Sequence, residues 1–239
     1  MEAILFSIAT FFSTYFGGRL AMRFKDKLHL ITGFSAGAVI GVAFFDLMPE
    51  ALELRNASAD FPFISLMICS GFVVYLILDR MIILHYHNEE HCENPRHRGI
   101  LTAGSLSLHS FLDGIVIGLA FQASSVIGTI VTIAVLAHDF SDGINTVSVI
   151  MKNNGDRKKA FNWLIIDAAA PVLGIFSTLF FSLPKNILGT LLAIFCGFFL
   201  YIGASDLLPE SHHAHPKKLT TIMTLLGILF IYLIMQITK

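Results

Sequence analysis

The chain has 239 residues, of which 55% are hydrophobic and only 14% are charged, and its mean hydropathy is +0.73. These values lie outside the range of soluble globular domains and inside that of membrane proteins. The net charge is −1 and no basic stripe runs along the sequence, which excludes a nucleic-acid-binding protein.

Eight apolar segments are long enough to form helices across a bilayer, whose hydrocarbon core is about 30 Å thick and needs roughly 20 residues. The sequence predicts spans at residues 3–18, 28–49, 61–84, 100–123, 125–151, 161–183, 187–209 and 219–237. The first segment lacks a basic region before it and a small-residue cleavage site after it, so we expect a retained helix. We predict an all-α integral membrane protein with one transmembrane domain over residues 1–239.

Lys and Arg residues are distributed unevenly between alternate loops. Thirteen of the 16 fall in or beside the connections after the first, third, fifth and seventh spans, and only Arg55, Lys185 and Lys239 lie on the opposite side. Basic residues near span ends are retained in the cytoplasm. The bias predicts that both chain termini face away from the cytoplasm, in a plasma or inner membrane.

Two distant segments share one motif. Residues 45–50, near the end of the second span, and residues 205–210, near the end of the seventh, both contain Asp-Leu-x-Pro-Glu. Because these two spans run in opposite directions, the pattern indicates an inverted repeat: a 3+2+3 arrangement in which spans 1–3 and 6–8 surround spans 4–5. The alternative is chance recurrence of a helix-ending Pro-Glu.

A second repeated motif lies in the two central spans. Residues 109–114 and 138–143 both read His-x-Phe-x-Asp-Gly. His and Asp four residues apart project from one face of a helix, so His109 with Asp113 and His138 with Asp142 form two edges, and Asp139 lies one turn before Asp142. The glycines that end each motif favour close packing of these helices.

The charge of these residues indicates a cation. Ionisable groups at bilayer depth are costly unless they are paired or hydrated. No Lys or Arg lies near the middle of a span to balance Asp113, Asp139, Asp142 or Asp167. Imidazole and carboxylate suit zinc, manganese and ferrous iron, whereas the motifs lack the sulfur ligands of copper(I). Asp167, one turn before Pro171, is open between a metal ligand, a proton carrier and a partner of a helix bend.

Histidines also gather outside the spans. Residues 85–93 contain three His, one Cys and three carboxylates, His97 follows, and His212, His213 and His215 come after Glu210. Such tracts bind metal loosely. We therefore treat residues 85–98 as a His-containing cytoplasmic loop with a role in metal release or sensing, the alternative being an ordinary solvated loop.

These motifs resemble those of the ZIP (Zrt/Irt-like) family of divalent metal transporters, in particular its prokaryotic branch, over essentially the whole chain. The resemblance implies eight spans, termini outside the cytoplasm, and metal ligands from the fourth and fifth spans. On the matching positions the implied ligands are His109, Asp113, His138, Asp139 and Asp142. Residues 205–213 are similar to the family segment whose acidic and His residues, here including Glu210, line the metal exit.

The chain departs from the family pattern at four positions. Ser110 and Leu112 replace the usual Asn and Pro of the fourth span, Ser141 replaces a Pro in the fifth, and Ala170 stands where many relatives have Glu before Pro171. We expect one firm metal site, made by His109, Asp113, His138 and Asp142. A second, weaker position is expected around Ser110 and Asp139, with Asp167 as a substitute for the missing Glu.

The sequence thus predicts a transporter, not an enzyme, that carries zinc first of all, with Fe²⁺, Mn²⁺ and Cd²⁺ as further candidates, into the cytoplasm by alternating access. Its expected partners are the metal ions and the lipid bilayer, with no cofactor and no nucleic acid, and a homodimer is allowed for. Two alternatives remain open: a membrane zinc hydrolase, which would use the same ligands, and a proton or sodium carrier.

Overall fold

The fold was analysed in a computed structural model, which describes residues 2–22, 28–55, 61–87, 95–153, 155–213 and 218–238. The helices are α1 (Glu2–Ala21), α2 (Leu28–Val42), η1 (Ala43–Leu47), α3 (Met48–Leu54), α4 (Phe61–His87), α5 (Pro95–Ala123), α6 (Ser125–Lys152), α7 (Arg157–Thr178), α8 (Lys185–Tyr201), η2 (Ile202–Leu207), α9 (Leu208–His213) and α10 (Lys218–Thr238). Within the described ranges every regular element is a helix.

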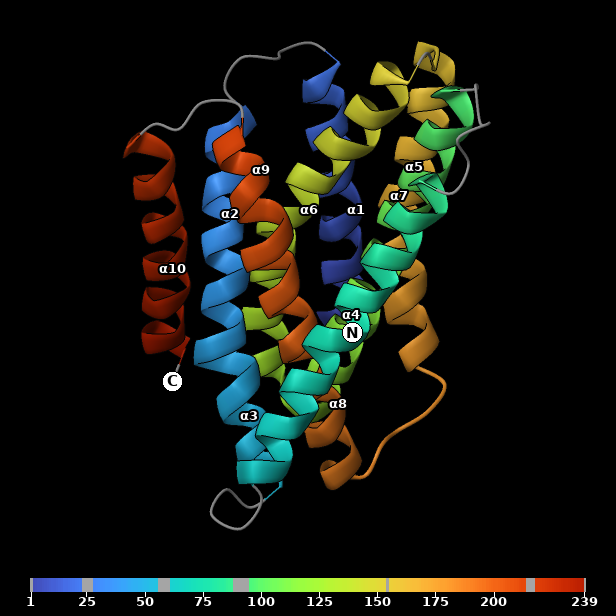
Figure 1. The fold of residues 1–239 in the computed structure, drawn as a ribbon. Helices are drawn as coiled ribbons and strands as arrows, with labels where there is room; N and C mark the ends of the chain where they lie inside the picture. Colours follow the sequence, from blue (N-terminus) through green and yellow to red (C-terminus); the bar gives the residue numbers. More distant parts are fainter. Residues whose placement is uncertain are drawn as a thin grey trace.

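Among the described residues, eight helical segments are long and apolar enough to cross a membrane, which agrees with the predicted number of spans. They form one bundle in which α2 with α3 and α8 with α9 make long, nearly continuous columns (Figure 1). Helix α7 differs from its predicted bounds at both ends, since it begins at Arg157 and ends at Thr178. Asp156 caps this helix by accepting the Lys159 backbone N–H at 2.7 Å, so the helix starts at the cap and not at the first apolar residue.

The expected loop at residues 85–98 is shorter in the structure. Helix α4 continues to His87 and α5 begins at Pro95, in keeping with the preference of proline for the first turn of a helix. The rest of the loop, and the side chains of residues 82–98, 210 and 212–217, lie outside what the structure describes. The metal-binding role of this loop and of the second His cluster stays a prediction.

The two Asp-Leu-x-Pro-Glu motifs have the same local structure. Each forms a π-helical turn, η1 before Pro49 and η2 before Pro209. A proline has no N–H for the carbonyl four residues earlier, and a widened turn provides other partners. Accordingly the Met48 N–H donates to the Ala43 carbonyl and the Leu208 N–H to the Gly203 carbonyl. The inverted repeat as a whole stays a prediction.

Glycines bring the helices together in pairs. A Cβ added at Gly114 of α5 would overlap the carbonyl oxygen of Pro171 in α7, and one at Gly174 of α7 would overlap that of Phe111. Equivalent reciprocal contacts join α1 with α6 through Gly17 and Gly143, α4 with α8 through Gly71 and Gly197, and α2 with α10 through Gly37 and Gly227. Small residues allow such close packing in membranes.

The prediction that Gly114 and Gly143 allow close packing of α5 against α6 is therefore wrong. Gly114 faces α7 and Gly143 faces α1, so neither glycine lies at the contact between α5 and α6. As a result α1, α5, α6 and α7 pack with one another as one group, whereas α2, α4, α8 and α10 form a second. Packing follows these helix faces, and the 3+2+3 arrangement stays a prediction.

We expect Gly114→Ala to lower the stability of the protein by about 1–3 kcal/mol, because the new methyl group would overpack the α5–α7 contact. Gly104→Ala on the same helix is the matched control, since its Cβ would lie 3.7 Å from Trp163, an ordinary contact. Thermal unfolding of both variants in detergent measures the difference. Equal unfolding temperatures would contradict the proposed tight contact.

Candidate metal centre

Four of the predicted site residues meet in the middle of the bundle. His109 lies at the centre of α5 and His138 at the centre of α6, and Asp113 and Asp142 lie one turn further along each helix. One ligand atom from each of the four residues lies within 4.8 Å of every other. All four residues are at least 93% buried. The i,i+4 spacing and the antiparallel packing of α5 against α6 together produce this cluster.

The distances suit a small ion with four ligands. Nε2 of His109 and Nε2 of His138 each lie 3.2 Å from Oδ2 of Asp113, and they lie 3.6 and 4.0 Å from Oδ2 of Asp142. Zinc binds nitrogen and oxygen at about 2.0–2.2 Å in a tetrahedron, whose edges are then about 3.4 Å long. Two carboxylates and two neutral imidazoles also carry the charge that balances one divalent cation.

Both imidazole rings are oriented by a hydrogen bond at Nδ1, the ring nitrogen that lies outside the cluster. The Nδ1–H of His138 donates to the Ala134 carbonyl at 3.1 Å, which leaves the lone pair of Nε2 directed into the cluster. His109 has its Nδ1 3.0 Å from the hydroxyl of Tyr75. Metal-ligating histidines are held in this manner in other proteins, because the outer hydrogen bond selects the tautomer that can bind.

Tyr75 was not identified from the sequence. It lies on α4, 34 positions before His109, and no motif surrounds it. The only local signal is a polar-tipped aromatic side chain within an apolar span. The contact joins the two helix groups, since α4 belongs to the second group and α5 to the first.

Of the remaining predicted site residues, Asp139, Asp167 and Ser110 lie beside the cluster and not in it. Asp167 is fully buried and accepts two hydrogen bonds, from Ser110 Oγ at 2.9 Å and from Thr146 Oγ1 at 2.8 Å. Asp139 is also fully buried, and in the described part of the chain neither of its oxygens has a hydrogen-bond partner. Glu210 belongs to α9, and its side chain lies outside the described ones.

A cavity of about 600 Å³ leads from the cluster to one end of the bundle. His109 and Asp142 line its inner part, and Thr102, Val149 and Asn153, near the start of α5 and the end of α6, line its outer part. Asp79 and Asp206 add carboxylates to the wall, and Asp79 accepts a hydrogen bond from Tyr201 at 2.7 Å. The cavity gives the cluster a polar route to this end.

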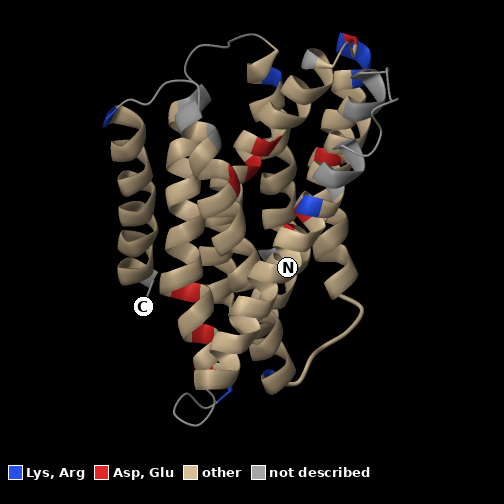
Figure 2. Cartoon of the chain, in the orientation of Figure 1, with Lys and Arg blue, Asp and Glu red and all other residues tan. Residues whose placement is uncertain are grey.

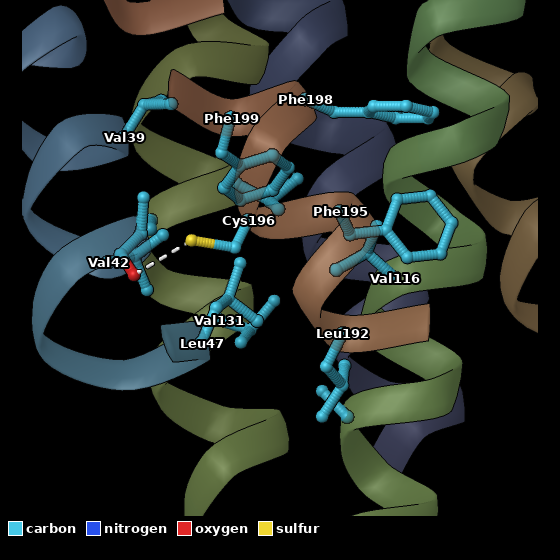
Figure 3. Packing of buried hydrophobic residues seen from close by; sticks show 14 of the residues in the cluster. Val39, Val42, Leu47, Val116, Val131, Leu192, Phe195, Cys196, Phe198 and Phe199 are labelled. Carbon is cyan, nitrogen blue, oxygen red and sulfur yellow. Dashed lines mark hydrogen bonds between the residues drawn. The ribbon is translucent and has the colours of Figure 1, made fainter. Parts of the chain in front are cut away.

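Beyond the cluster, toward the other end of the bundle, the interior is filled with apolar side chains (Figure 3). Val116 of α5, Val131 of α6 and Val39 of α2 pack there with Phe195, Phe198 and Phe199 of α8. The ring of Phe199 lies 5.9 Å from that of His138 and is 1% exposed. The site is open on one side and closed by packing on the other.

The open side is the one with the basic loops. Helix α1 ends, and α7 and α10 begin, at the upper end in Figure 1. Lys and Arg gather mainly there, while most Asp and Glu lie further inside the bundle (Figure 2). His109 and His138 are close enough to Asp113 and Asp142 to form ion pairs with them when protonated.

Comparison with known proteins agrees with this geometry. The family model described as ZIP Zinc transporter matches residues 1–98 and 85–235, nearly the whole chain. The chain belongs to the ZIP zinc transporter family. This confirms the resemblance, and because the family consists of transporters, it also confirms the prediction of a transporter and not a hydrolase.

Three similar animal proteins are named as zinc transporters. "Zinc transporter ZIP9" of Micropogonias undulatus is 26% identical over 88% of this chain and 86% of that protein. "Zinc transporter ZIP9-B" of Xenopus laevis is 26% identical over 90% of this chain and 88% of that protein. "Zinc transporter ZIP10" of Mus musculus is 32% identical, but over only 44% of this chain and 13% of that protein.

Proposed function

We propose that this ZIP family protein carries Zn²⁺ across a membrane into the cytoplasm through the cluster of His109, Asp113, His138 and Asp142. The observation that supports this most directly is the convergence of four buried ligand atoms within 4.8 Å. The same ligand set suits Fe²⁺, Mn²⁺ and Cd²⁺. One transporter domain spans residues 1–239, and neither a cofactor nor a nucleic acid enters the cycle.

The transport direction rests on orientation. Because the basic loops favour the cytoplasm, the cavity that leads from the cluster opens toward the cytoplasm, and the apolar packing around Phe199 faces outside. Both termini then lie on the outer side of a plasma or inner membrane. In this proposal, the conformation with the open cavity is the step from which metal is released inward.

Alternating access requires the apolar packing to open while the cavity closes. We infer that the helix group of α1, α5, α6 and α7, which holds the cluster, shifts relative to the group of α2, α4, α8 and α10. The contacts between these groups near the site include hydrogen bonds that such a shift would change: Tyr75 with His109, and Ser35 Oγ to the Ala137 carbonyl at 2.6 Å.

We also propose a second, weaker metal position around Ser110 and Asp139, with Asp167 beside it. Its support is the unpartnered carboxylate of Asp139. Asp167 already accepts two hydroxyl hydrogen bonds, so it would have to give up part of this network to bind metal. We therefore expect the second position to be filled only at higher metal concentration.

Transport is tested by metal uptake into proteoliposomes that contain the purified protein, with zinc, manganese, ferrous and cadmium ions offered separately. We expect saturable zinc uptake, lost in the His109→Ala/Asp142→Ala variant. Metal binding without flux would favour the membrane hydrolase, and the absence of any metal binding would favour the proton or sodium carrier.

Labelling of cysteine variants tests the open side. In a variant whose native cysteines are replaced by Ala, we expect Ser105→Cys, on the cavity wall, to react with a membrane-impermeant maleimide only from the cytoplasmic side. Val116→Cys, which is fully buried in the apolar packing, is the control and should react from neither side without substrate. Labelling of Ser105→Cys from outside alone would contradict the orientation.

A further inference from the structure

A second cavity, of about 810 Å³, lies between the end of α1, the start of α7 and the side of α6. Its lining divides into two kinds of side chain. Three are cations, namely Arg19, Arg157 and Lys158, and most of the others are apolar, among them Phe16, Phe140 and Phe161. The metal centre and its cavity share none of these residues. The transport cycle described above does not use them.

The three cations have no counter-ion among the described side chains. All three are exposed, and within the described part of the chain none forms an ion pair with a carboxylate. Asp156 is adjacent in sequence to Arg157, but its Oδ1 accepts the backbone N–H of Lys159 as the cap of α7. Two helices therefore bring three cations to one cavity, and none of the three forms an ion pair with a described side chain.

The position of this cavity relative to the membrane is defined by the spans. The candidate membrane span of α1 ends at Ala21, two residues after Arg19, and that of α7 begins at Arg157. The cations thus lie at the level of the lipid headgroups. Phe16 and Phe161 lie about one helical turn deeper, and Phe16 is 57% exposed on the lipid-facing surface.

We propose that this cavity binds an anionic phospholipid of the leaflet on the side of the basic loops. Arg19, Arg157 and Lys158 bind the phosphate, to which guanidinium groups donate paired hydrogen bonds, and the phenylalanines contact the first part of an acyl chain. A soluble phosphate would match the cations but would leave the aromatic wall without a partner. The cavity has cations at the headgroup level and phenylalanine side chains about one turn deeper. This order matches the headgroup and acyl chain of a phospholipid.

The proposal does not depend on which ion the protein carries, because lipid binding is measured directly. Native mass spectrometry of the full-length protein in detergent, titrated with phosphatidylglycerol or phosphatidylcholine, measures the affinity for each. We expect phosphatidylglycerol to bind at least about tenfold more tightly, and Arg157→Gln and Lys158→Gln each to weaken it about fivefold. Arg19→Gln tests the contribution of the other helix in the same manner.

Lys159→Gln is the matched control, because it removes the same charge from the same helix at an exposed residue that does not line the cavity. Only the backbone N–H of Lys159 takes part in the helix cap, so the substitution leaves the cap intact. We expect it to leave the affinity for phosphatidylglycerol unchanged. Thermal unfolding in phosphatidylcholine verifies that each variant is folded, and the three single variants provide independent tests.

Three results would overturn the proposal. Equal affinity for the two lipids would show that the cations do not select a charged headgroup. An equal loss in Lys159→Gln would show a diffuse charge effect without a defined site. Displacement of phosphatidylglycerol by inorganic phosphate or glycerol 3-phosphate at the same concentration would assign the cavity to a soluble anion.

Discussion

Asp113→Asn is expected to abolish saturable zinc uptake and to weaken zinc binding by more than about 100-fold. Asp113 is the central group of the cluster, because its Oδ2 lies 3.2 Å from the Nε2 atoms of both His109 and His138. Asparagine keeps the volume of the side chain but loses its negative charge. Loss of an outer partner of a metal ligand already costs 10–100-fold in affinity, and loss of a direct ligand costs more.

The matched control is Glu53→Gln, the same type of substitution at an exposed carboxylate of α3. Zinc uptake into proteoliposomes and equilibrium zinc binding should be unchanged in this variant. Both proteins are compared by thermal unfolding without metal, so that loss of fold is separated from loss of binding. If Asp113→Asn took up zinc at the wild-type rate, the cluster would not be part of the transport pathway.

Tyr75→Phe is expected to weaken zinc binding by about 10–100-fold while it leaves the fold intact. The substitution removes only the hydroxyl that lies 3.0 Å from Nδ1 of His109, and the edge contact of the two rings at 5.9 Å remains. Without this partner the imidazole can rotate or adopt the tautomer whose Nε2 carries a proton. We expect the concentration for half-maximal uptake to rise more than the maximal rate falls.

Tyr201→Phe is the control for this prediction. It removes a hydroxyl that donates to Asp79 at 2.7 Å, and its ring lies 5.3 Å from that of Tyr75. The same type of hydrogen bond is thus lost nearby without an effect on a histidine of the cluster. Zinc affinity should change by much less than in Tyr75→Phe. Equal changes in the two variants would indicate a general effect of the cavity wall.

Much of the fold could be predicted because helix formation in a membrane is a local requirement. Backbone groups in hydrocarbon must bond within their own segment, so apolar length alone identifies the eight spans. Helix ends were less predictable, since the Asp156 cap starts α7 before its apolar run and Pro95 starts α5 within a polar region. The π-turns before Pro49 and Pro209 follow from the missing proline N–H.

The grouping of the helices could not be predicted from their order in the chain. Gly114 and Gly143 were expected at one shared contact, but each faces a different neighbour, α7 and α1 respectively. A glycine in a motif indicates that a helix face packs closely against another segment, but it does not identify that segment. Contacts between distant segments decide this, and a single sequence contains no direct record of them.

The sequence by itself determined the number of spans, the candidate ligand types and the pairing of His with Asp on one helix face, because these depend on length, chemistry and the helical repeat. The tertiary structure decided which acidic residues meet. It brings Asp113 and Asp142 to both histidines, but it ties Asp167 to Ser110 and Thr146 and leaves Asp139 beside the cluster. It also decided that the Tyr75 hydroxyl contacts Nδ1 of His109 and that the cavity leads from the site to the end of the bundle with the basic loops. Both features depend on how separate helices pack.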